Sequence, residues 1–383
     1  MIYDITLDVE QGLNPFLASK TPANGLEASA KSSPDTDNGL QILGRGVKEL
    51  VQAVRALRHL GVEDLDLPLP KIVVVGDQST GKSSLIEGMS EIKVPRSAGT
   101  CTRCPLEINL TEDNDPEGQW SCNVSLHNKY VYQSSLKERA TKARPLGPWA
   151  DSDGEDHPFA RITSKDDVVD ALERAQLATL NPSSSYEKYK PGNPLPDRTH
   201  QVKFSPNIIR LDISGPGLPN LSFFDLPGVI NVSEVPNEAY FVDLVRNLVK
   251  EYIKAPDCIN LLALTMTHDA ANSSAFGLIQ EMKAEPRTVG CLTKPDRMAR
   301  NDALDQWAQI LGGKAFQLGF GYHVIKNNQD PNVDHVTARQ EEAAFFSNQV
   351  PWTDELSEFE HRFGTLRLQT ALSQRLTTQI RTW

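Results

Sequence analysis

A glycine-rich run at residues 73–84, VVVGDQSTGKSS, holds residue types that can bind a polyphosphate. Gly76, Gly81, Lys82 and Ser83 have the G-x-x-x-x-G-K-S spacing of a P-loop. Glycines let backbone N–H groups surround the phosphates, and a following helix adds the positive end of its dipole. We expect Lys82 to reach the β- and γ-phosphates and the Ser83 hydroxyl to ligate Mg²⁺. The alternative for this run alone is an ordinary Gly/Ser turn.

A second motif, FFDLPG at residues 223–228, is an apolar run that ends in D-x-x-G. Asp225 can hold a Mg²⁺-bound water there, and the Gly228 N–H can face a γ-phosphate. This tetrad is common in proteins, so by itself it is weak evidence for a phosphate site. Its position directly after a strand-like run is what supports that interpretation. A D-x-x-G that follows a P-loop along the chain fits a protein that hydrolyses a nucleoside triphosphate.

A third motif, CLTKPD at residues 291–296, is a strand-like run that ends in T-K-x-D, beginning at Thr293. Guanine presents N1–H and an N2 amino group on one edge, and a carboxylate can accept both hydrogen bonds. Adenine lacks this donor pair, so Asp296 is expected to select guanine, with a preference of about 1–3 kcal/mol by analogy with base readout. Lys294 is expected to lie along the base and to brace the P-loop. A solvated Lys/Asp turn is the alternative.

Residues 94–105, VPRSAGTCTRCP, lie between the P-loop and D-x-x-G. A threonine in such a loop can ligate Mg²⁺ and sense the γ-phosphate, so that the loop becomes ordered only when a triphosphate is bound. Cys101 and Cys104 have a C-x-x-C spacing that zinc and redox sites also use. A zinc site would need two more ligands, and only the isolated Cys122 and scattered histidines are available. We therefore expect neither zinc binding nor redox chemistry.

The elements that must position these motifs alternate between strands and helices. Strands are expected before the P-loop and at 104–110, 121–126, 208–213, 221–225, 258–266, 287–293 and 322–325. Helices are expected after the P-loop and at 43–60, 166–178, 238–254, 303–311 and 365–383. This alternation predicts the α/β fold of a P-loop NTPase, with a doubly wound, mainly parallel sheet.

Composition along the chain predicts four parts. These are a flexible leader at 1–40, a neck helix in 41–70, a GTP-binding domain at 71–345 and a C-terminal neck helix region at 346–383. The helices at 43–60 and 365–383 are expected to form a small helical bundle built from both ends of the chain.

A long insertion is expected at about 111–205, and its polar part from about 141 to 207 is expected to lie on the surface around one helix. The acidic stretch DSDGED at 151–156 resembles a calcium loop, but it lacks the glycine at the sixth position and the glutamate at the twelfth. We expect it to be a solvated acidic loop.

The bulk properties indicate a cytoplasmic protein. The N-terminal stretch has no basic region and no apolar core of a signal peptide, and no apolar run approaches the ~20 residues of a membrane span. Five cysteines are few and odd in number, which argues against a disulfide framework. The net charge of −11 disfavours nonspecific attraction to nucleic acid, so no nucleic-acid partner is expected.

Together the motifs GDQSTGKSSLIE, VPRSAGTCTRCPL, FFDLPGV and TKPDRM resemble the GTPase head of the dynamin superfamily. The T-R-C-P sequence and the preceding LRHLGVEDLDLPLPKIVVVGDQ are most similar to its Mx-like and fungal dynamin-like members. The resemblance spans about residues 43–383, does not extend to 1–40 and is weak within 111–205. It implies a dynamin-type GTPase domain.

The resemblance also implies how hydrolysis is catalysed. Ras-like GTPases place a water-orienting Gln directly after D-x-x-G, whereas this chain has Val229. In dynamin-like heads the P-loop glutamine orients the water, and it matches Gln78. The next residue, Ser79, matches the serine that helps to hold a K⁺ or Na⁺ ion against the phosphates, with backbone carbonyls at Ser97 and Gly99. Thr102 would fix the attacking water, and the implied catalytic set is Gln78, Ser79, Lys82 and Thr102.

Two further contacts follow from the resemblance alone. Family heads dimerise across the nucleotide face, and Asp269 matches a residue that reaches the partner's nucleotide site. Residues 326–329, KNNQ, match the last guanine loop. The expected GTP-binding residues are Asp77, Gln78, Ser79, Thr80, Gly81, Lys82, Ser83, Ser84, Arg96, Ser97, Gly99, Asp225, Gly228, Thr293, Lys294, Asp296, Lys326, Asn327 and Gln329.

We therefore expect a GTPase that binds GTP with Mg²⁺, with Ser83 and Thr102 on the metal and Asp225 reaching it through water. Resemblance to the family implies activation by homodimerisation and coupling to membrane remodelling or polymer assembly through a stalk. The chain ends at Trp383, before any stalk, and is expected to be a fragment or a truncated product. The alternatives are a non-catalytic GTP-dependent switch or scaffold, and an ATPase of the P-loop class.

Overall fold

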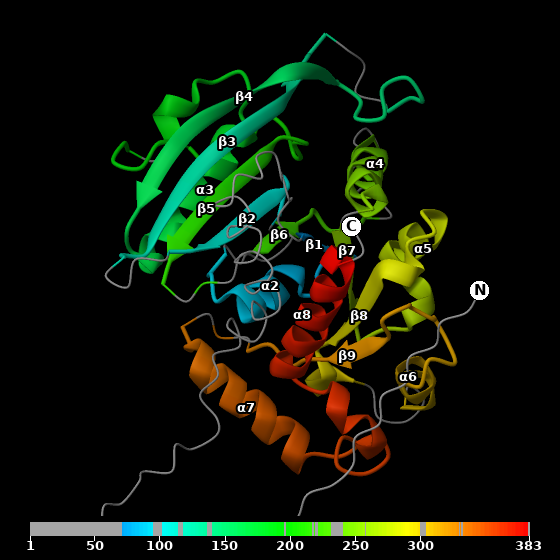
Figure 1. Cartoon of the computed structure of the whole chain (residues 1–383). Coiled ribbons are helices and arrows are strands. Elements are labelled where there is room, and N and C mark those ends of the chain that lie inside the picture. Colours follow the sequence, from blue (N-terminus) through cyan, green and yellow to red (C-terminus); the bar gives the residue numbers. More distant parts are fainter. Residues whose placement is uncertain are drawn as a thin grey trace, which may run out of the picture. The chain divides into compact units, whose positions relative to one another are not determined.

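A computed structural model gives the fold of the chain (Figure 1). It describes residues 71–94, 102–113, 118–135, 140–194, 197–216, 218, 221–230, 240–256, 258–298, 304–328, 330 and 332–381. The strands are β1 (Lys71–Gly76), β2 (Leu106–Glu112), β3 (Ser121–Tyr132), β4 (Trp149–Ile162), β5 (Ile208–Gly215), β6 (Leu221–Asp225), β7 (Cys258–Thr265), β8 (Thr288–Thr293) and β9 (Tyr322–Val324). The α-helices are α2 (Lys82–Ser90), α3 (Val168–Thr179), α4 (Tyr240–Lys254), α5 (Ser274–Glu281), α6 (Leu304–Leu311), α7 (His335–Asn348) and α8 (Thr365–Arg381).

The strands of the described ranges form one nine-stranded sheet in the order β4-β3-β5-β2-β6-β1-β7-β8-β9. β1 lies between β6 and β7 and runs parallel to both. β2–β5, β7–β8 and β8–β9 are parallel too, whereas β2–β6, β3–β4 and β3–β5 are antiparallel. The sequence-based prediction of an α/β fold with a mainly parallel sheet is confirmed.

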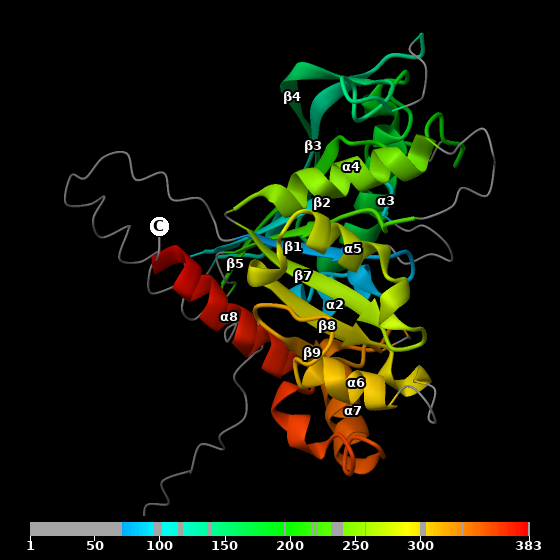
Figure 2. The ribbon, with the colours of Figure 1, turned by 90° about the vertical axis from the view of Figure 1, so that its right-hand side faces the viewer.

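The apolar sequence of β1 explains why helices cover both faces of the sheet. Successive strand residues point to opposite faces, so Ile72 and Val74 join one buried cluster while Val73 and Val75 join the other. The first cluster contains apolar side chains of α2, α3 and α8, and the second those of α4, α5 and α6. Figure 2 shows α4, α5 and α6 on the same side of the central strands. Because β1 is buried on both faces, the loop that follows it starts from a fixed point.

The insertion does not form the surface loop that its polar sequence predicted. Residues 149–162 make the long edge strand β4, which pairs antiparallel with β3, and DSDGED at 151–156 lies within this strand. The expected solvated acidic loop is therefore wrong. Most side chains in the middle of β4 are exposed and the strand has a neighbour on one side only, so it carries little of the apolar pattern that reveals a buried strand. The expected helix at 166–178 is present as α3, preceded by a short 3-10 turn.

The C-terminal helix α8 places the expected leucine stripe against the sheet. Leu368, Leu372 and Leu376 are buried in the same cluster as Leu85 and Met89 of α2. Its apolar face thus packs against the α/β core. The helix expected at 43–60 lies outside the described residues, so the bundle of both chain ends stays a prediction. No helix in the described ranges is long and apolar enough to cross a membrane.

Candidate functional site

The P-loop connects the carboxyl end of β1 to the first turn of α2. Ser79 and Gly81 both have left-handed backbone conformations, with φ of 63° and 89°. Such φ values cost little for glycine and fold the loop back on itself, so that its N–H groups can face one point. The Asp77 carbonyl accepts hydrogen bonds from Thr80 Oγ1 at 2.9 Å and Lys82 Nζ at 3.1 Å. The Lys82 ammonium is thereby held over the loop, as a phosphate-binding lysine requires.

Three oxygen-bearing side chains meet beside the start of α2. Ser83 Oγ and Thr102 Oγ1 each donate to Asp225 Oδ2 at 2.9 Å, and the two hydroxyls lie 3.3 Å apart. Asp225 is 1% exposed, and burial raises its carboxyl pKa. Its other oxygen, Oδ1, is buried and has no hydrogen-bond partner among the described residues.

This cluster fits Mg²⁺. Hydroxyl and carboxylate oxygens are the ligand types that Mg²⁺ takes, and the unpartnered Asp225 Oδ1 leaves an acceptor for a metal-bound water. A nearby cation would also lower the carboxyl pKa that burial raises, because it favours the charged form. Other metals find less support, since the described residues contain no group of three or more His, Cys, Asp or Glu side chains placed to bind an ion. Cys104 of the C-x-x-C pair is buried and its thiol pKa is raised to about 12, which argues against a reactive thiol.

The D-x-x-G segment lies directly against the P-loop. Because β6 pairs with β1, Asp225 is in register with Val74. The chain then continues in contact, with the Val229 N–H donating to the Gly76 carbonyl and the Gln78 N–H to the Val229 carbonyl, both at 3.1 Å. A Cβ added to Gly228 would lie 2.8 Å from Gln78 Cα and 3.0 Å from Lys82 Nζ. Gly228 therefore has to be a glycine for the two motifs to approach this closely.

The T-K-x-D motif reaches the P-loop from the other side. Thr293 Oγ1 donates to the Thr80 carbonyl at 2.6 Å, and Lys294 Nζ donates to the Ser79 carbonyl at 2.6 Å. Partial burial lowers the Lys294 pKa. Asp296 follows in a 3-10 turn and stays partly exposed. The brace between Lys294 and the P-loop that the motif predicted is therefore present in the geometry.

The loop after β9 lies against α2 and the P-loop. The Asn327 side chain lies 3.4 Å from the Cβ position of Gly88 in α2 and 4.0 Å from that of Gly81. Glu342 of α7, which sequence reasoning missed, accepts from the Lys326 N–H at 2.8 Å. Its carboxylate also accepts from the N–H and hydroxyl of Thr365 at 2.8 and 3.2 Å. One acidic residue in an exposed-looking helix gives no sequence signal for such a role.

Two expected site residues use their side chains within the chain. The Asp77 carboxylate accepts from Ser273 Oγ at 2.7 Å and from the Ala275 N–H at 3.1 Å, at the start of α5. Asp269, expected to contact a dimer partner, accepts from the Ala271 N–H at 2.8 Å. Within the P-loop, Asp77 contributes its backbone carbonyl, which accepts from Thr80 and Lys82.

Asp269 nevertheless stays at the surface. Its carboxylate also accepts from Gln306 Nε2 at 2.6 Å, and its pKa is lowered, mainly by the backbone hydrogen bond from Ala271. Gln78 and Ser79 are exposed residues of the P-loop itself, and Lys294 contacts the loop at the Ser79 carbonyl. Four expected site residues fall outside the described part of the chain, and their predicted roles stay predictions: Arg96, Ser97, Gly99 and Gln329.

Comparison with known proteins agrees with this geometry. A family model described as the dynamin family matches residues 72–295, which is more than half of the chain. The chain belongs to the dynamin family. This dynamin-family chain is 28% identical to the interferon-induced GTP-binding protein Mx1 of Ovis aries over 82% of the chain and 41% of that protein. It is 27% identical to Mx1 of Bos taurus (92% of the chain, 47% of that protein) and 30% identical to the Mx protein of Solea senegalensis (79% and 41%).

These matches confirm the predicted dynamin superfamily membership and its Mx-like character. The chain spans less than half the length of the relatives it matches. The matched family segment, 72–295, includes the P-loop, D-x-x-G and the first three of the four T-K-x-D residues, and it ends just before Asp296. The Glu342 contacts and α8 lie beyond it.

Proposed function

We propose that this dynamin-family chain binds GTP together with Mg²⁺ and hydrolyses it to GDP and phosphate. The observation that carries the proposal is the approach of two other motifs, D-x-x-G and T-K-x-D, to the P-loop from opposite sides. Gly228 and Asp225 approach the P-loop from β6, while Thr293 and Lys294 donate to its carbonyls from β8. A polyphosphate on the loop would lie between the two, with its base toward Asp296.

Each side chain has a role that its position supports. Mg²⁺ would be held by Ser83 and Thr102, with Asp225 reaching it through water, and would neutralise charge on the β- and γ-phosphates. Lys82 would stabilise the charge that develops on the γ-phosphate oxygens. Gln78 would hold the attacking water in line with the γ-phosphate, because Val229 cannot donate or accept a hydrogen bond through its side chain.

The finer parts of the proposal concern activation. We propose that K⁺ or Na⁺ binds near Ser79, with carbonyls of Ser97 and Gly99, and replaces the charge of an arginine finger. Two heads would dimerise across the nucleotide face, with Asp269 supplying a contact to the partner. Asp269 is exposed, and hydrogen bonds from Ala271 and Gln306 hold its carboxylate in place and lower its pKa. In a longer protein, a stalk would couple the cycle to membrane remodelling or polymer assembly in the cytoplasm.

Replacing Gln78 with alanine tests the catalytic part. We expect the rate of phosphate release from GTP to fall at least tenfold, because the attacking water would no longer be held in line with the γ-phosphate. Binding of a fluorescent GTP analogue should be retained, since Gln78 is exposed at the loop and its backbone contact to Val229 stays. Steady-state phosphate release and fluorescence titration measure the two quantities. Gln280→Ala, on the exposed face of α5, is the matched control. Unchanged turnover in the Gln78 variant would favour the non-catalytic switch or scaffold.

Replacing Asp296 with asparagine tests base selection separately. The wild type should bind GTP in preference to ATP. In the variant the ratio of GTP affinity to ATP affinity should fall at least fivefold, about 1 kcal/mol, because an amide cannot accept both guanine hydrogen bonds. Competition of unlabelled GTP and ATP against a fluorescent GTP analogue measures the ratio. Asp305→Asn, exposed on α6, is the control. Equal displacement by ATP and GTP from the wild type would instead support an ATPase.

A further inference from the structure

A cavity lies within the segment between residues 111 and 207, and none of its lining residues belongs to the three nucleotide motifs. It has a volume of about 430 Å³ and opens between the β3–β4 hairpin and the end of α3. This volume falls within the range of small-ligand and side-chain binding pockets. Three tyrosines, two carboxylates and a histidine give its walls their chemistry: Tyr130, Tyr132, Tyr186, Asp153, Glu155 and His157.

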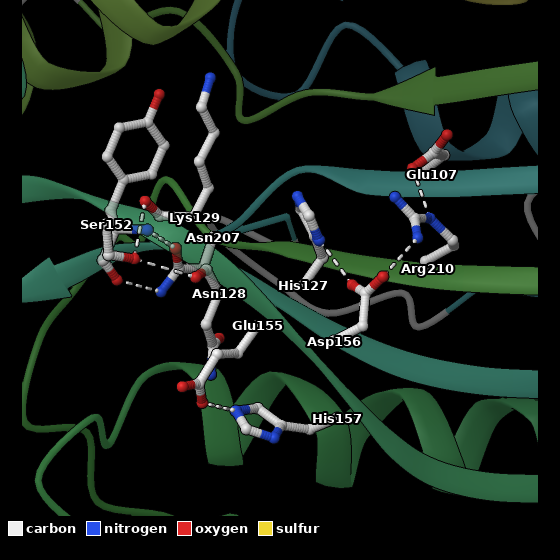
Figure 3. A network of polar contacts seen from close by, with 11 residues as sticks. Glu107, His127, Asn128, Lys129, Ser152, Glu155, Asp156, His157, Asn207 and Arg210 are labelled. Carbon is white, nitrogen blue, oxygen red and sulfur yellow. Dashed lines mark hydrogen bonds and ion pairs between the residues drawn. The ribbon is translucent and has the colours of Figure 1, made fainter.

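The acidic side chains of β4 are divided between the two faces of the strand, and those of one face are paired with basic residues. Asp156 accepts from Arg210 Nη1 at 3.3 Å and pairs with His127 Nδ1 at 2.5 Å, and these contacts lower its pKa. Arg210 also binds Glu107 at 2.9 Å. Figure 3 shows Asp156 directed toward Arg210 and His127, and Glu155 directed toward His157. Consecutive strand residues point to opposite faces, so Asp156 and its partner Arg210 lie on the face away from the cavity, whereas Glu155 lies on the cavity face. The positive charge of Arg210 therefore does not compensate the carboxylates of the cavity.

The cavity face is left with excess negative charge. Glu155 lies 3.4 Å from His157 Nε2, and Asp153 has no ion pair with any described residue. No lysine or arginine of the described ranges lines the cavity. Lys129 and Lys190 approach the rings of Tyr130 and Tyr186, at 5.5 and 5.1 Å from their centroids, from outside the lining. The two carboxylates favour a cation, and the tyrosine side chains can pack against an aliphatic stem that carries it.

The unpaired edge of β4 indicates that the cation would belong to an extended peptide segment. β4 is the terminal strand of the sheet, and within the described residues its only strand partner is β3. Its outer N–H and C=O groups can therefore pair with an added extended segment. Acidic side chains at 151, 153 and 155 repel a second β4 edge but complement a basic strand. Edge and cavity thus select the same partner chemistry.

We propose that the β4 edge and this cavity bind an extended basic segment of a partner protein, with one arginine or lysine side chain seated between the carboxylates and the tyrosine rings. Main-chain pairing along β4 supplies affinity that does not depend on sequence. Asp153 and Glu155 supply the selection for positive charge. The site does not rest on GTP hydrolysis, because none of its lining residues belongs to the nucleotide motifs.

The test uses a short fluorescein-labelled peptide in which arginine alternates with valine, followed by fluorescence anisotropy. We expect saturable binding to the wild-type chain and at least a tenfold weaker affinity for the double variant Asp153→Asn/Glu155→Gln. The double variant Asp166→Asn/Asp167→Asn removes the same charge from an exposed turn outside the cavity and should bind as the wild type does. Unchanged GTP hydrolysis in both variants shows that the fold is intact.

Two altered peptides separate the contribution of the arginine charge from that of backbone pairing along β4. Replacing each arginine with citrulline keeps the shape and removes the charge, so binding should be lost at the cavity. Replacing the central valine with proline removes a backbone donor and should weaken strand pairing. Equal affinity of the arginine and citrulline peptides, equal loss in the two double variants or the absence of saturable binding would each overturn the proposal. The second of these outcomes would show only general attraction to an acidic protein.

Discussion

Replacing Gly228 with alanine is expected to lower GTP hydrolysis at least a hundredfold. The added methyl group would lie 2.8 Å from Gln78 Cα and 3.0 Å from Lys82 Nζ, distances that real Cβ contacts do not accept without movement. The backbone of Gln78 cannot move far, because its N–H is bonded to Val229 within the same contact. The D-x-x-G segment must therefore shift away from the P-loop, and a displacement of about 1 Å at the reacting groups costs on the order of 10² in rate.

The same substitution at Gly277 provides the control. Gly277 lies in α5, and a Cβ added there meets no heavy atom within 4 Å. Gly277→Ala should leave hydrolysis unchanged and, by removing a helix glycine, should stabilise the fold slightly. Steady-state phosphate release and thermal unfolding of both variants distinguish a site effect from a folding effect. Hydrolysis by Gly228→Ala within tenfold of the wild type would mean that the two motifs do not need this close approach.

Buried, strongly periodic elements could be predicted from the sequence, and exposed ones could not. β7 and β8 are almost wholly buried and rich in apolar residues, and α4 carries a continuous apolar face, so these elements can be recognised from the sequence. β4 and α7 were not predicted from the sequence, because few of their side chains are buried. Most side chains of the middle of β4 face solvent, and α7 buries only Glu342, Phe345 and Phe346. Their positions are set by pairing with β3 and by packing against the end of the chain, which a local pattern does not record.

The motifs could be placed near one another, but their contacts could not be foreseen. Parallel strands end at the same edge of a sheet, so the expected strands already predicted that the P-loop, D-x-x-G and T-K-x-D would meet. The sequence did not show that Asp77 would turn its carboxylate to the start of α5. Asp269 likewise accepts from Ala271 and Gln306 within its own chain. Polar side chains at helix starts are often capping groups, which compete with any site role that a motif assigns.

Replacing Glu342 with alanine is expected to lower the free energy of unfolding by about 3 kcal/mol and to weaken GTP binding. Its carboxylate is 5% exposed and accepts from the Lys326 N–H, the Thr365 N–H and the Thr365 hydroxyl. Alanine would leave these buried donors without a partner, and each such donor costs about 1–3 kcal/mol, partly offset by water. Because Lys326 begins the loop that carries Asn327 toward Gly81, the loss should reach the base end of the proposed nucleotide site.

Glu341→Ala supplies the matched control on the same helix. Glu341 is exposed and accepts from Asn328 Nδ2 at 2.6 Å, so it contacts the same loop without being buried. Exposed polar contacts contribute little, and this variant should stay within about 0.5 kcal/mol of the wild type. Denaturant unfolding and titration with a fluorescent GTP analogue measure both effects. If Glu342→Ala loses stability but binds GTP normally, the carboxylate holds only α7 to α8. Loss of both would show that the base loop is held in place from the C-terminal end of the chain, through one buried carboxylate that joins it to the start of α8.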